Sequence, residues 1–384
     1  MQKPIYLDNG ATSFPKAPGV SAAVCRYIDE VGANISRGSY QQAADAAMIV
    51  LETREKLAKL FHFTEDINHV IFTPGMTFGL NMLLRGSLRR GDHVIVSSME
   101  HNAVMRPLMD LTQQGVTFSR IPADKNGITN PQDILPLFQE NTKLVMVSHA
   151  SNVSGTLFPL QQVADICHQK GIFLAVDAAQ TAGHYPIDFE KLHLAALSVP
   201  GHKGLLGPQG IGAVLLRDDF AKQLTPLVTG GTGSASDSEI QPDMLPDRFE
   251  SGTMNLPGIF GLHAALEFIE QTGIDVLDHK ERHLAKRFLA GMEELPVRIA
   301  GPQTDADRVG VISLDFLKMD NADAAFALEQ DFGICTRCGL HCAPNAHKTL
   351  NTFPQGTVRF SIGYATTEAE IDFAINAIKQ ITQA

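Results

Sequence analysis

Apolar residues recur along the chain with two different spacings. Short runs of apolar, often β-branched, residues predict strands, whereas stretches with an apolar residue every three or four positions predict helices. The predicted strands in the first part of the chain are residues 69–72, 93–97, 144–148, 173–176, 195–199 and 213–216. The predicted helices before and between them are residues 43–61, 77–88, 103–113 and 159–169. This alternation predicts an α/β fold with a mostly parallel sheet covered by helices on both faces.

The pattern changes after about residue 256. Long helical stretches come first, and strands then alternate with shorter helices. The predicted elements are helices at 259–271, 275–294, 322–330 and 368–380 and strands at 309–316 and 357–361. They indicate a smaller α+β domain packed on the first, with a boundary near residues 253–258, a segment that contains Pro257.

Composition narrows the class of protein. The 384 residues are 44% hydrophobic, which is enough for a large core and two domains, and the net charge of -11 argues against a nucleic-acid surface. No apolar run is long enough to span a membrane, and none follows the first lysine as in a signal peptide. Five cysteines, an odd number, suggest reduced thiols rather than a disulfide framework. We therefore expect a cytoplasmic protein with no membrane or nucleic-acid partner.

A lysine with possible chemistry follows the predicted strand at 195–199. Lys203 lies in the segment 198–210, which is so rich in glycine and proline that its backbone must turn tightly. A lysine that loses water contact there loses proton affinity and becomes an amine that can form a Schiff base. The same segment fits a solvated surface lysine equally well.

Four other strand ends carry polar residues of the kind that bind a planar, phosphorylated cofactor. Asp177 ends an apolar strand and is suited to pair with a protonated pyridine nitrogen, while Gln180 could donate to a ring hydroxyl. Residues 73–77 link a strand to a helix, whose start favours phosphate. His101 and Asn152 follow two further strands. Helix capping is the alternative role for Asp177 and for His101, and a solvated ring is a further alternative for His101.

Taken in order, these segments resemble the cysteine desulfurases of the class V aminotransferase group, which are fold-type I pyridoxal-phosphate enzymes. The resemblance rests on seven segments in the family's order. They are residues 6–12, 100–104, 151–152, 177–180, 201–203, 248–253 and 339–344. It implies a large cofactor domain at 15–256 with a mostly parallel seven-stranded sheet, and a smaller α+β C-terminal domain formed by residues 1–14 and 257–384. It also implies a homodimer with shared active sites.

The resemblance assigns roles to individual residues. Lys203 would bind pyridoxal 5'-phosphate covalently and carry protons, His101 would stack on the ring and act as acid or base, and Asp177 would hold the ring nitrogen. Further contacts to the ring and phosphate would come from Gly75, Met76, Thr77, Asn152, Gln180, Ser198, His202 and, from the other subunit, Thr253. The substrate would contact Asn9, Ala11, Asn152, Arg337 and Arg359, with Arg359 clamping its carboxylate.

Two positions depart from the family pattern. Many relatives have hydroxyl residues where this chain has Pro200 and Met76. The phosphate would then have fewer side-chain donors, and backbone N–H groups, Thr77, Ser198 or a further serine could compensate.

Cys342 is the candidate for sulfur chemistry. Its thiolate would attack the sulfur of the bound substrate and leave alanine and an enzyme persulfide, and Arg337 and His341 could stabilise the charge. Three alternatives stay open. The first is a metal site formed by Cys335, Cys338, Cys342, His341 and His347, although our assignment contains no metal. The second is a structural thiol, the role that we expect for Cys25 and Cys167 in helices. The third is a redox pair of Cys338 with Cys342.

The sequence thus predicts a pyridoxal-phosphate-dependent L-cysteine desulfurase that passes sulfur to an acceptor protein. Selenocysteine lyase is the nearest alternative, since selenium leaves readily even without a cysteine nucleophile. Another class V aminotransferase or C–S lyase is a more distant one, and its product would be a keto acid rather than alanine. A non-catalytic scaffold that merely kept the fold is disfavoured by the intact Lys203, Asp177 and His101.

Overall fold

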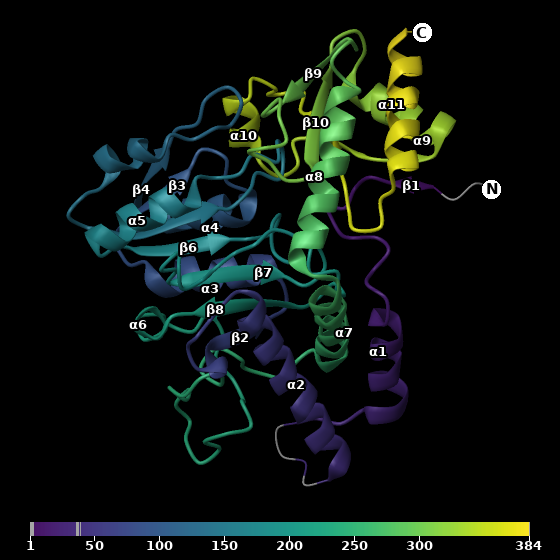
Figure 1. Ribbon diagram of the computed structural model, residues 1–384. Helices are drawn as coiled ribbons and strands as arrows, with labels where there is room; N and C mark the ends of the chain where they lie inside the picture. The colour runs from purple at the N-terminus through teal and green to yellow at the C-terminus, as the bar shows by residue number, and fades with distance from the viewer. Residues whose placement is uncertain (1–3, 36–37, 39, 384) are drawn as a thin grey trace.

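The computed structural model describes residues 4–35, 38 and 40–383, and its centre is a seven-stranded sheet (Figure 1). The strands lie in the order β2-β8-β7-β6-β5-β3-β4. Their bounds are β2 Val70–Thr73, β3 His93–Ser97, β4 Thr117–Ile121, β5 Thr142–Ser148, β6 Phe173–Asp177, β7 Ala196–Pro200 and β8 Gly212–Leu216. Only β8 runs antiparallel to its neighbours β2 and β7, whereas the remaining pairs are parallel. The predicted α/β class and mostly parallel seven-stranded sheet are confirmed.

Helices cover both faces of this sheet, which explains why its strands are apolar along their whole length. In β5, Leu144 and Met146 face a cluster that contains α3 Met76–Ser87 and α4 Asn102–Gln113. The intervening Val145 and Val147 face a second cluster with side chains from α2, α5 and α7. These helices span Gln41–Leu60, Leu160–Lys170 and Leu256–Thr272. The period of two thus distributes alternate residues of one strand between two buried layers.

A second unit is built on a four-stranded antiparallel sheet in the order β12-β13-β10-β9. Its strands are Arg337–Gly339, Thr357–Ser361, Val311–Phe316 and Val297–Ala300. Side chains of α8 Ile274–Ala290, α9 Asn321–Phe332 and α11 Glu368–Gln383 form its core. The chain's first strand, β1 Ile5–Tyr6, joins this unit by pairing in parallel with β11 Ile334–Cys335. Figure 1 shows this N-terminal segment, in purple, beside the C-terminal elements.

Some helices and strands of the structure were not predicted from the pattern of apolar residues. The edge strand β4 reads Thr-Phe-Ser-Arg-Ile and is partly exposed, so it lacks an apolar run. The short strands β1, β9, β11 and β12 and the helices α1 Val20–Arg26, α6 Asp218–Ala221 and α10 Pro344–Thr349 were also not predicted. A π-helical turn, Tyr27–Val31, extends α1, and two 3-10 helices span Ile67–His69 and Pro131–Leu137. Long-range pairing, rather than local propensity, fixes the short strands.

The predicted domain limits stay a prediction. Residues 256–272 form α7, whose apolar side chains, including Ile259, Leu262 and Leu266, lie in the core of the large sheet. In α8, Leu277 still belongs to that core, whereas Leu284 and Phe288 belong to the small unit. This packing favours a boundary within α8 over one at residue 257.

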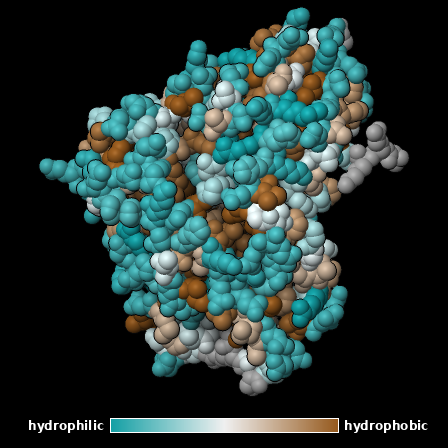
Figure 2. Space-filling view, in the orientation of Figure 1, coloured by the Kyte–Doolittle hydropathy of each residue, from teal (hydrophilic) through white to brown (hydrophobic). Residues whose placement is uncertain are grey.

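Figure 2 shows that the visible face is hollowed in its middle, and that apolar residues lie inside this hollow. No helix in the described ranges is long and apolar enough to cross a membrane.

Candidate active site

The carboxyl ends of β5, β6 and β7 bring most of the predicted cofactor residues, though not Gly75, Ser198 or Thr253, around one cavity of about 200 Å³. Its wall is formed by Met76, Thr77, His101, Ala103, Ser148, Ala150, Asn152, Asp177, Ala179, Gln180, His202 and Lys203. Parallel strands end at the same edge of a sheet, so residues far apart in sequence converge there. The roles of the individual residues remain predictions, but their meeting in one cavity is an observation.

Lys203 lines this cavity rather than the outer surface, contrary to the solvated alternative. Burial, opposed by the charge of Asp177, lowers the pKa of the Lys203 amine to about 8. Asp177 is buried, and burial raises the pKa of its carboxyl group, although the Ala179 N–H and Lys203 act in the other direction. Its Oδ1 accepts the Ala179 N–H at 2.8 Å, as a capping residue would. No described residue donates a hydrogen bond to its Oδ2, which is therefore available to a ligand.

His101 has both roles that the sequence left open, because it caps α4 and also lines the cavity. Its Nδ1 accepts the Ala103 N–H at 3.0 Å, so the proton of the neutral ring lies on Nε2. Burial, helped by the charges of Lys203, Arg359 and Arg106, lowers the pKa of His101 to about 4. The ring is therefore uncharged at neutral pH and offers one N–H. Its predicted stacking on a cofactor remains a prediction.

The predicted phosphate residues divide into groups. Met76 and Thr77 lie on the cavity wall at the start of the 12-residue helix α3, and Gly75 precedes them with φ of 148°, a conformation that suits glycine. Ser198 is fully buried and is not part of the cavity lining, but its hydroxyl donates at 3.2 Å to the Sδ atom of Met76, which is. Thr253 lines a different cavity, together with residues 72–74 and 210–211.

His202 is held by an N-terminal turn that sequence reasoning missed. Its Nδ1 lies 3.0 Å from the Thr12 hydroxyl, and burial, with the charges of Lys203 and Lys16, lowers its pKa to about 4. Lys16 donates to the Thr12 and Ser13 hydroxyls and to the His202 carbonyl, at 3.1, 3.1 and 2.9 Å. Burial lowers the pKa of Lys16 to about 8. Nothing in the spacing of residues 12–16 signals this contact with residue 202.

The same turn uses two predicted site residues for its own structure. Asn9 donates to the backbone carbonyls of Tyr6 and Ser361 and accepts the Phe14 N–H. Gln180 lines the cavity, and its Nε2 donates to the Gly10 carbonyl at 3.1 Å. The side-chain amide of Asn9 is therefore committed to the fold, and any effect that it has on substrate would act through the turn. Ala11 lies in this turn as well, and its backbone N–H donates to the Asp8 carbonyl.

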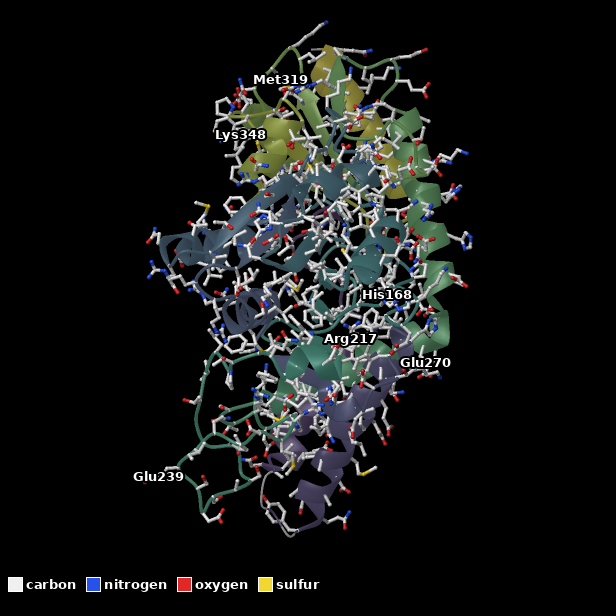
Figure 3. All side chains as sticks on the ribbon, turned by 90° about the vertical axis from the view of Figure 1, so that its left-hand side faces the viewer. His168, Arg217, Glu239, Glu270, Met319 and Lys348 are labelled. Atoms are coloured by element: carbon white, nitrogen blue, oxygen red, sulfur yellow. The ribbon has the colours of Figure 1, made fainter. Side chains whose placement is uncertain are left out.

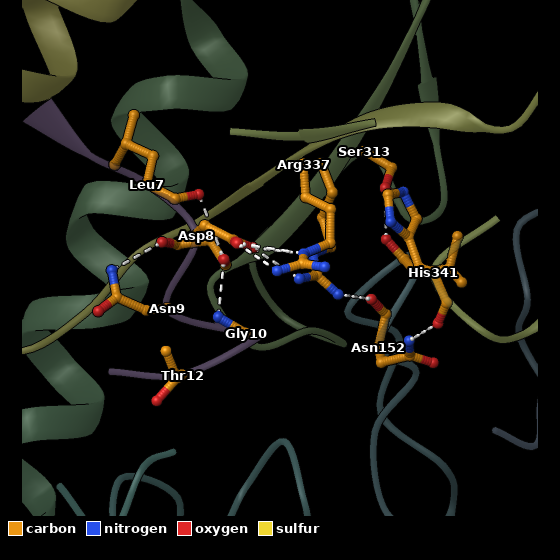
Figure 4. A network of polar contacts seen from close by, with 12 residues as sticks. Leu7, Asp8, Asn9, Gly10, Thr12, Asn152, Ser313, Arg337 and His341 are labelled. Atoms are coloured by element: carbon orange, nitrogen blue, oxygen red, sulfur yellow. Dashed lines mark hydrogen bonds and ion pairs between the residues drawn. The ribbon is translucent and has the colours of Figure 1, made fainter. Parts of the chain in front are cut away.

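The two predicted substrate arginines converge on Asp8 (Figure 4). Arg359 Nη2 donates to Asp8 Oδ1 at 2.8 Å, and Arg337 Nη2 donates to Asp8 Oδ2 at 2.9 Å. Arg359 Nη1 also donates to the Asn152 carbonyl at 3.1 Å, and Asn152 Nδ2 donates to the His341 carbonyl at 2.6 Å. A continuous hydrogen-bonded chain therefore runs from Asp8 to the loop that carries Cys342. Sequence reasoning did not select Asp8, although it lies in the quoted segment 6–12.

Cys342 is exposed on a strained loop beside the cavity. His341 and Cys342 both have left-handed φ angles, 48° and 58°, which side chains other than glycine seldom adopt. The Cys342 carbonyl accepts the Asn102 N–H at 2.7 Å, which fixes the loop against the start of α4. Cys342 lines an open basin that shares Thr77 and His101 with the cofactor cavity, so the two spaces adjoin.

The predicted help of His341 to the Cys342 thiolate stays a prediction, and the charge of the imidazole ring limits the form that it can take. Burial, with the charges of Arg359 and His347, lowers the pKa of His341 to about 2, so the ring carries no charge at neutral pH. Arg337 remains a candidate. Its pKa is raised, chiefly by the hydrogen bond to Asp8 and in smaller part by the charge of Cys342.

The other cysteines give little support to the competing readings of this region. Arg337 and Cys338 are neighbours in β12, so they point to opposite faces, and Arg337 faces Asp8. This geometry disfavours a bond between Cys338 and Cys342. No metal-binding group of three or more His, Cys, Asp or Glu residues occurs in the part of the chain that the structure describes. Cys167 is buried, as expected of a structural thiol, and burial raises its pKa to about 12. Cys25 is exposed, contrary to expectation.

A second buried carboxyl group lies behind Asp177. Glu100 accepts hydrogen bonds from the Ser97 hydroxyl and from the N–H and hydroxyl of Ser148, and Ser148 pairs with Asp177 across β5 and β6. Burial raises the pKa of Glu100 to about 7, and the charge of Asp177 adds to the rise, although the hydrogen bonds from Ser97 and Ser148 oppose it. Glu100 adjoins His101, yet sequence reasoning gave it no role, because its burial depends on the packing of three strand ends.

Glu100→Gln should change how stability depends on pH. The folded chain keeps the Glu100 proton up to about pH 7, whereas an unperturbed group releases it near 4.5. The folded state therefore binds more protons between these values, and its free energy of unfolding falls as the pH rises. The variant should gain stability relative to the parent over this window, by on the order of 1 to 3 kcal/mol. Denaturant titrations of both proteins at the two ends of the window measure this. The same difference at both pH values would contradict it.

Comparisons with known proteins agree with the geometry. The model of the family described as Aminotransferase class-V matches residues 5–373. A probable cysteine desulfurase from Methanothermobacter thermautotrophicus is 33% identical, and the alignment covers 98% of this chain and 94% of that protein. A cysteine desulfurase from Escherichia coli is 31% identical over 98% of this chain and 93% of its own length.

Solved structures give the same result for the fold. The apo structure of a cysteine desulfurase from Thermococcus onnurineus matches with a TM-score of 0.92 at 31% identity, and it covers 99% of this chain and 95% of that one. A cysteine desulfurase from Escherichia coli matches with a TM-score of 0.87 at 27% identity, with the same coverage. The chain therefore belongs to the aminotransferase class V family and has the α/β fold of its cysteine desulfurases.

Proposed function

We propose that the protein is a pyridoxal-phosphate-dependent L-cysteine desulfurase, which converts cysteine to alanine and leaves a persulfide on Cys342. The observation that carries the proposal is the position of Cys342. Its thiol is exposed on a left-handed loop beside the cavity that holds Lys203 and Asp177. Curated relatives along nearly the whole chain are named cysteine desulfurases, which supports the same activity.

The cavity fits pyridoxal phosphate in the chemistry of its donors. Lys203 offers an amine with lowered pKa for covalent attachment, and Asp177 Oδ2 is free to accept the ring N–H. At the other end, the start of α3 with Thr77, together with the His202 ring, would hold the phosphate. When bound, the cofactor supplies an electron-withdrawing ring that stabilises negative charge next to the substrate's α-carbon.

The side chains divide the remaining work. Lys203 would take the proton from the substrate's α-carbon and return it, and His101, neutral with its proton on Nε2, would donate a hydrogen bond at the ring. The Cys342 thiolate would attack the substrate's sulfur. An S–S bond forms, the C–S bond breaks, and its electron pair stays on carbon, where a proton completes alanine. Arg337 and Arg359 would hold the substrate's carboxylate.

The experiment that tests this function follows the products. The purified protein is incubated with cysteine, and alanine and protein-bound persulfide are measured together. Equal amounts of alanine and persulfide in the first turnover are expected. A keto acid in place of alanine would instead assign an aminotransferase or C–S lyase. A parallel incubation with selenocysteine measures the selenocysteine lyase alternative, in which alanine would form without a persulfide on Cys342.

The chain further suggests a homodimer in which Thr253 contacts the phosphate of the neighbouring site. Within one chain Thr253 lies outside the cofactor cavity. The loop around Glu239 extends away from the body (Figure 3), and it exposes Ile240 and Met244 by 80% and 72%. Large apolar side chains so exposed are typical of an interface. Light scattering should give a mass of about twice the 41.6 kDa of one chain. A mass of one chain would remove Thr253 from the site.

The sulfur of the persulfide must be transferred to another molecule before Cys342 can react again. We propose that an acceptor protein takes the sulfur from Cys342, whose exposed position leaves it open to a second protein. All five cysteines are free thiols in the structure, which is compatible with the reducing cytoplasm that we propose as its compartment.

A further inference from the structure

Asp8 is the only acid that contacts either of the two substrate arginines among the described residues. One oxygen accepts from Arg359 Nη2 at 2.8 Å, and the other accepts from Arg337 Nη2 and Nε at 2.9 and 3.1 Å. The carboxylate therefore accepts hydrogen bonds from both guanidinium groups and holds them together (Figure 4). Paired carboxylate and guanidinium groups of this kind are directional as well as strong.

The two arginines differ in how much they depend on Asp8. The Arg359 side chain is 3% exposed, whereas that of Arg337 is 51% exposed. Burial lowers the pKa of Arg359, and Asp8 is the first group that opposes the decrease. A buried cation that loses its counterion is costly, so Arg359 needs Asp8 while the site holds no substrate. Arg337 is instead positioned by Asp8, because solvent could otherwise accommodate its charge in many orientations.

The backbone around Asp8 is fixed by the small unit. Asp8 forms a parallel bridge with Ser361, two residues beyond Arg359 in β13, and the Gly10 N–H donates to the Ser361 hydroxyl at 2.7 Å. A Cβ atom at Gly10 would lie 3.4 Å from Arg359 Cζ, so the turn passes tightly over the guanidinium. The carboxylate is thus held rigidly against the arginines and is not a mobile surface group.

The charges of Arg337, Arg359 and Asp8 do not cancel, so this group can bind one more anion. Two guanidinium groups and one carboxylate give a net charge of +1, which a single substrate carboxylate neutralises. Arg359 also has a buried Nε–H without a hydrogen-bond partner, which is an unusual cost unless a ligand accepts it. The donor set is therefore incomplete in a way that one carboxylate would complete.

We propose that Asp8 is a specificity-determining residue that limits the arginine clamp to amino acids with one negative charge. This inference rests on the proposed function, in which Arg337 and Arg359 bind the substrate's carboxylate. Asp8 already supplies one anion to the pair, so a second acid group on the substrate meets its repulsion without a free guanidinium to offset it. Amino acids of the aspartate class are disfavoured, and those with a neutral side chain, such as cysteine, are accepted.

Propionate and succinate provide the test, because they carry one and two carboxylates and lack the amine that would react at Lys203. Their affinities are measured by ligand-observed NMR, with both the holoenzyme and the cofactor-free protein. The parent protein should bind succinate no more tightly than propionate. In Asp8→Asn, which keeps the shape and removes the charge, the ratio of succinate to propionate affinity should rise about tenfold. Asp8→Glu keeps the charge and should retain the parental ratio.

A second variant keeps the proposal testable if Asp8→Asn folds poorly. Arg337→Gln removes a charge of opposite sign from a half-exposed side chain, so the ratio should fall below that of the parent. The double variant Asp8→Asn/Arg337→Gln restores a net charge of +1 and should return toward the parental ratio.

The outcomes distinguish a failure of the proposed role of Asp8 from a failure of the proposed function. A parental ratio in a folded Asp8→Asn protein that still binds propionate would overturn the role of Asp8 and leave the proposed function intact, as would an unchanged ratio in Arg337→Gln. Failure of cysteine to displace propionate from the parent protein would instead contradict the arginine clamp of the proposed function, and with it the role of Asp8.

Discussion

Lys203→Ala should abolish alanine formation from cysteine, with a loss of at least about four orders of magnitude in rate. The variant loses both the covalent attachment of the cofactor and the group proposed to carry the α-proton. Its visible absorbance from the attached cofactor should disappear, while its fold persists, because the Lys203 amine lines a cavity and makes no ion pair that the core requires. Absorbance spectra and an alanine assay measure the two effects. Lys222→Ala, at an exposed position beyond α6, is the matched control and should behave like the parent.

The same lysine predicts a pH dependence. The amine must be unprotonated to react with an aldehyde, and its pKa is lowered to about 8. The rate at which cofactor-free protein takes up pyridoxal phosphate should therefore rise with pH and level off above about 8. A rate that continues to rise toward the ordinary lysine value of 10.5 would show that burial does not activate this amine.

Cys342→Ala should separate cofactor binding from sulfur transfer. The cofactor cavity is left intact, so the absorbance of the holoenzyme should be unchanged. Alanine formation from cysteine should fall at least about a thousandfold, because no thiolate remains to attack the substrate's sulfur, and no persulfide should form. Alanine formation from selenocysteine should decline much less, since selenium leaves without that attack.

Cys338→Ala is the matched control for this variant. Cys338 is also exposed and lies four residues away, but its strand neighbour Arg337 faces Asp8, so Cys338 points to the other face of β12. The control should keep the parental rate. A Cys342→Ala protein that made alanine from cysteine at the parental rate would show that the nucleophile has been assigned wrongly.

The large sheet could be read from the sequence because its inner strands are buried on both faces. Residues 144–148 and 173–176 are almost continuously apolar, and this pattern does not depend on how the strands are aligned with one another. The edge strand β4 could not be found in this way, since its polar side chains face solvent on an open edge. In the small unit, β1 and β11 are two residues each and exist only because they pair with each other.

The residues of the candidate site also divide into those that could be predicted from the sequence and those that could not. Lys203, Asp177 and His101 could be proposed because each follows a predicted strand and has a side chain with suitable chemistry. Asp8 and Lys16 could not, because their partners are Arg359 and His202, far along the chain. The pattern of apolar residues predicts where strands end. It does not predict which distant segment of the chain packs against those ends.

The predicted role of Ser198 stays a prediction. Ser198 pairs in register with Asp177, so the two side chains point to the same face of the sheet, and its hydroxyl donates to Met76 Sδ on the cavity wall. The contact between Ser198 and Met76 depends on how α3 packs on β7, which a count of donors along the sequence does not contain.

Covalent attachment of the cofactor at residue 203 is the central claim, and peptide mass spectrometry tests it most directly. The holoenzyme is treated with borohydride, which reduces the link between amine and cofactor to a stable bond, and is then digested. The peptide containing Lys203 should carry the mass of a phosphopyridoxyl group, and other lysine peptides should not. An unmodified Lys203 peptide from protein that retains the cofactor, or the added mass on another lysine, would contradict it.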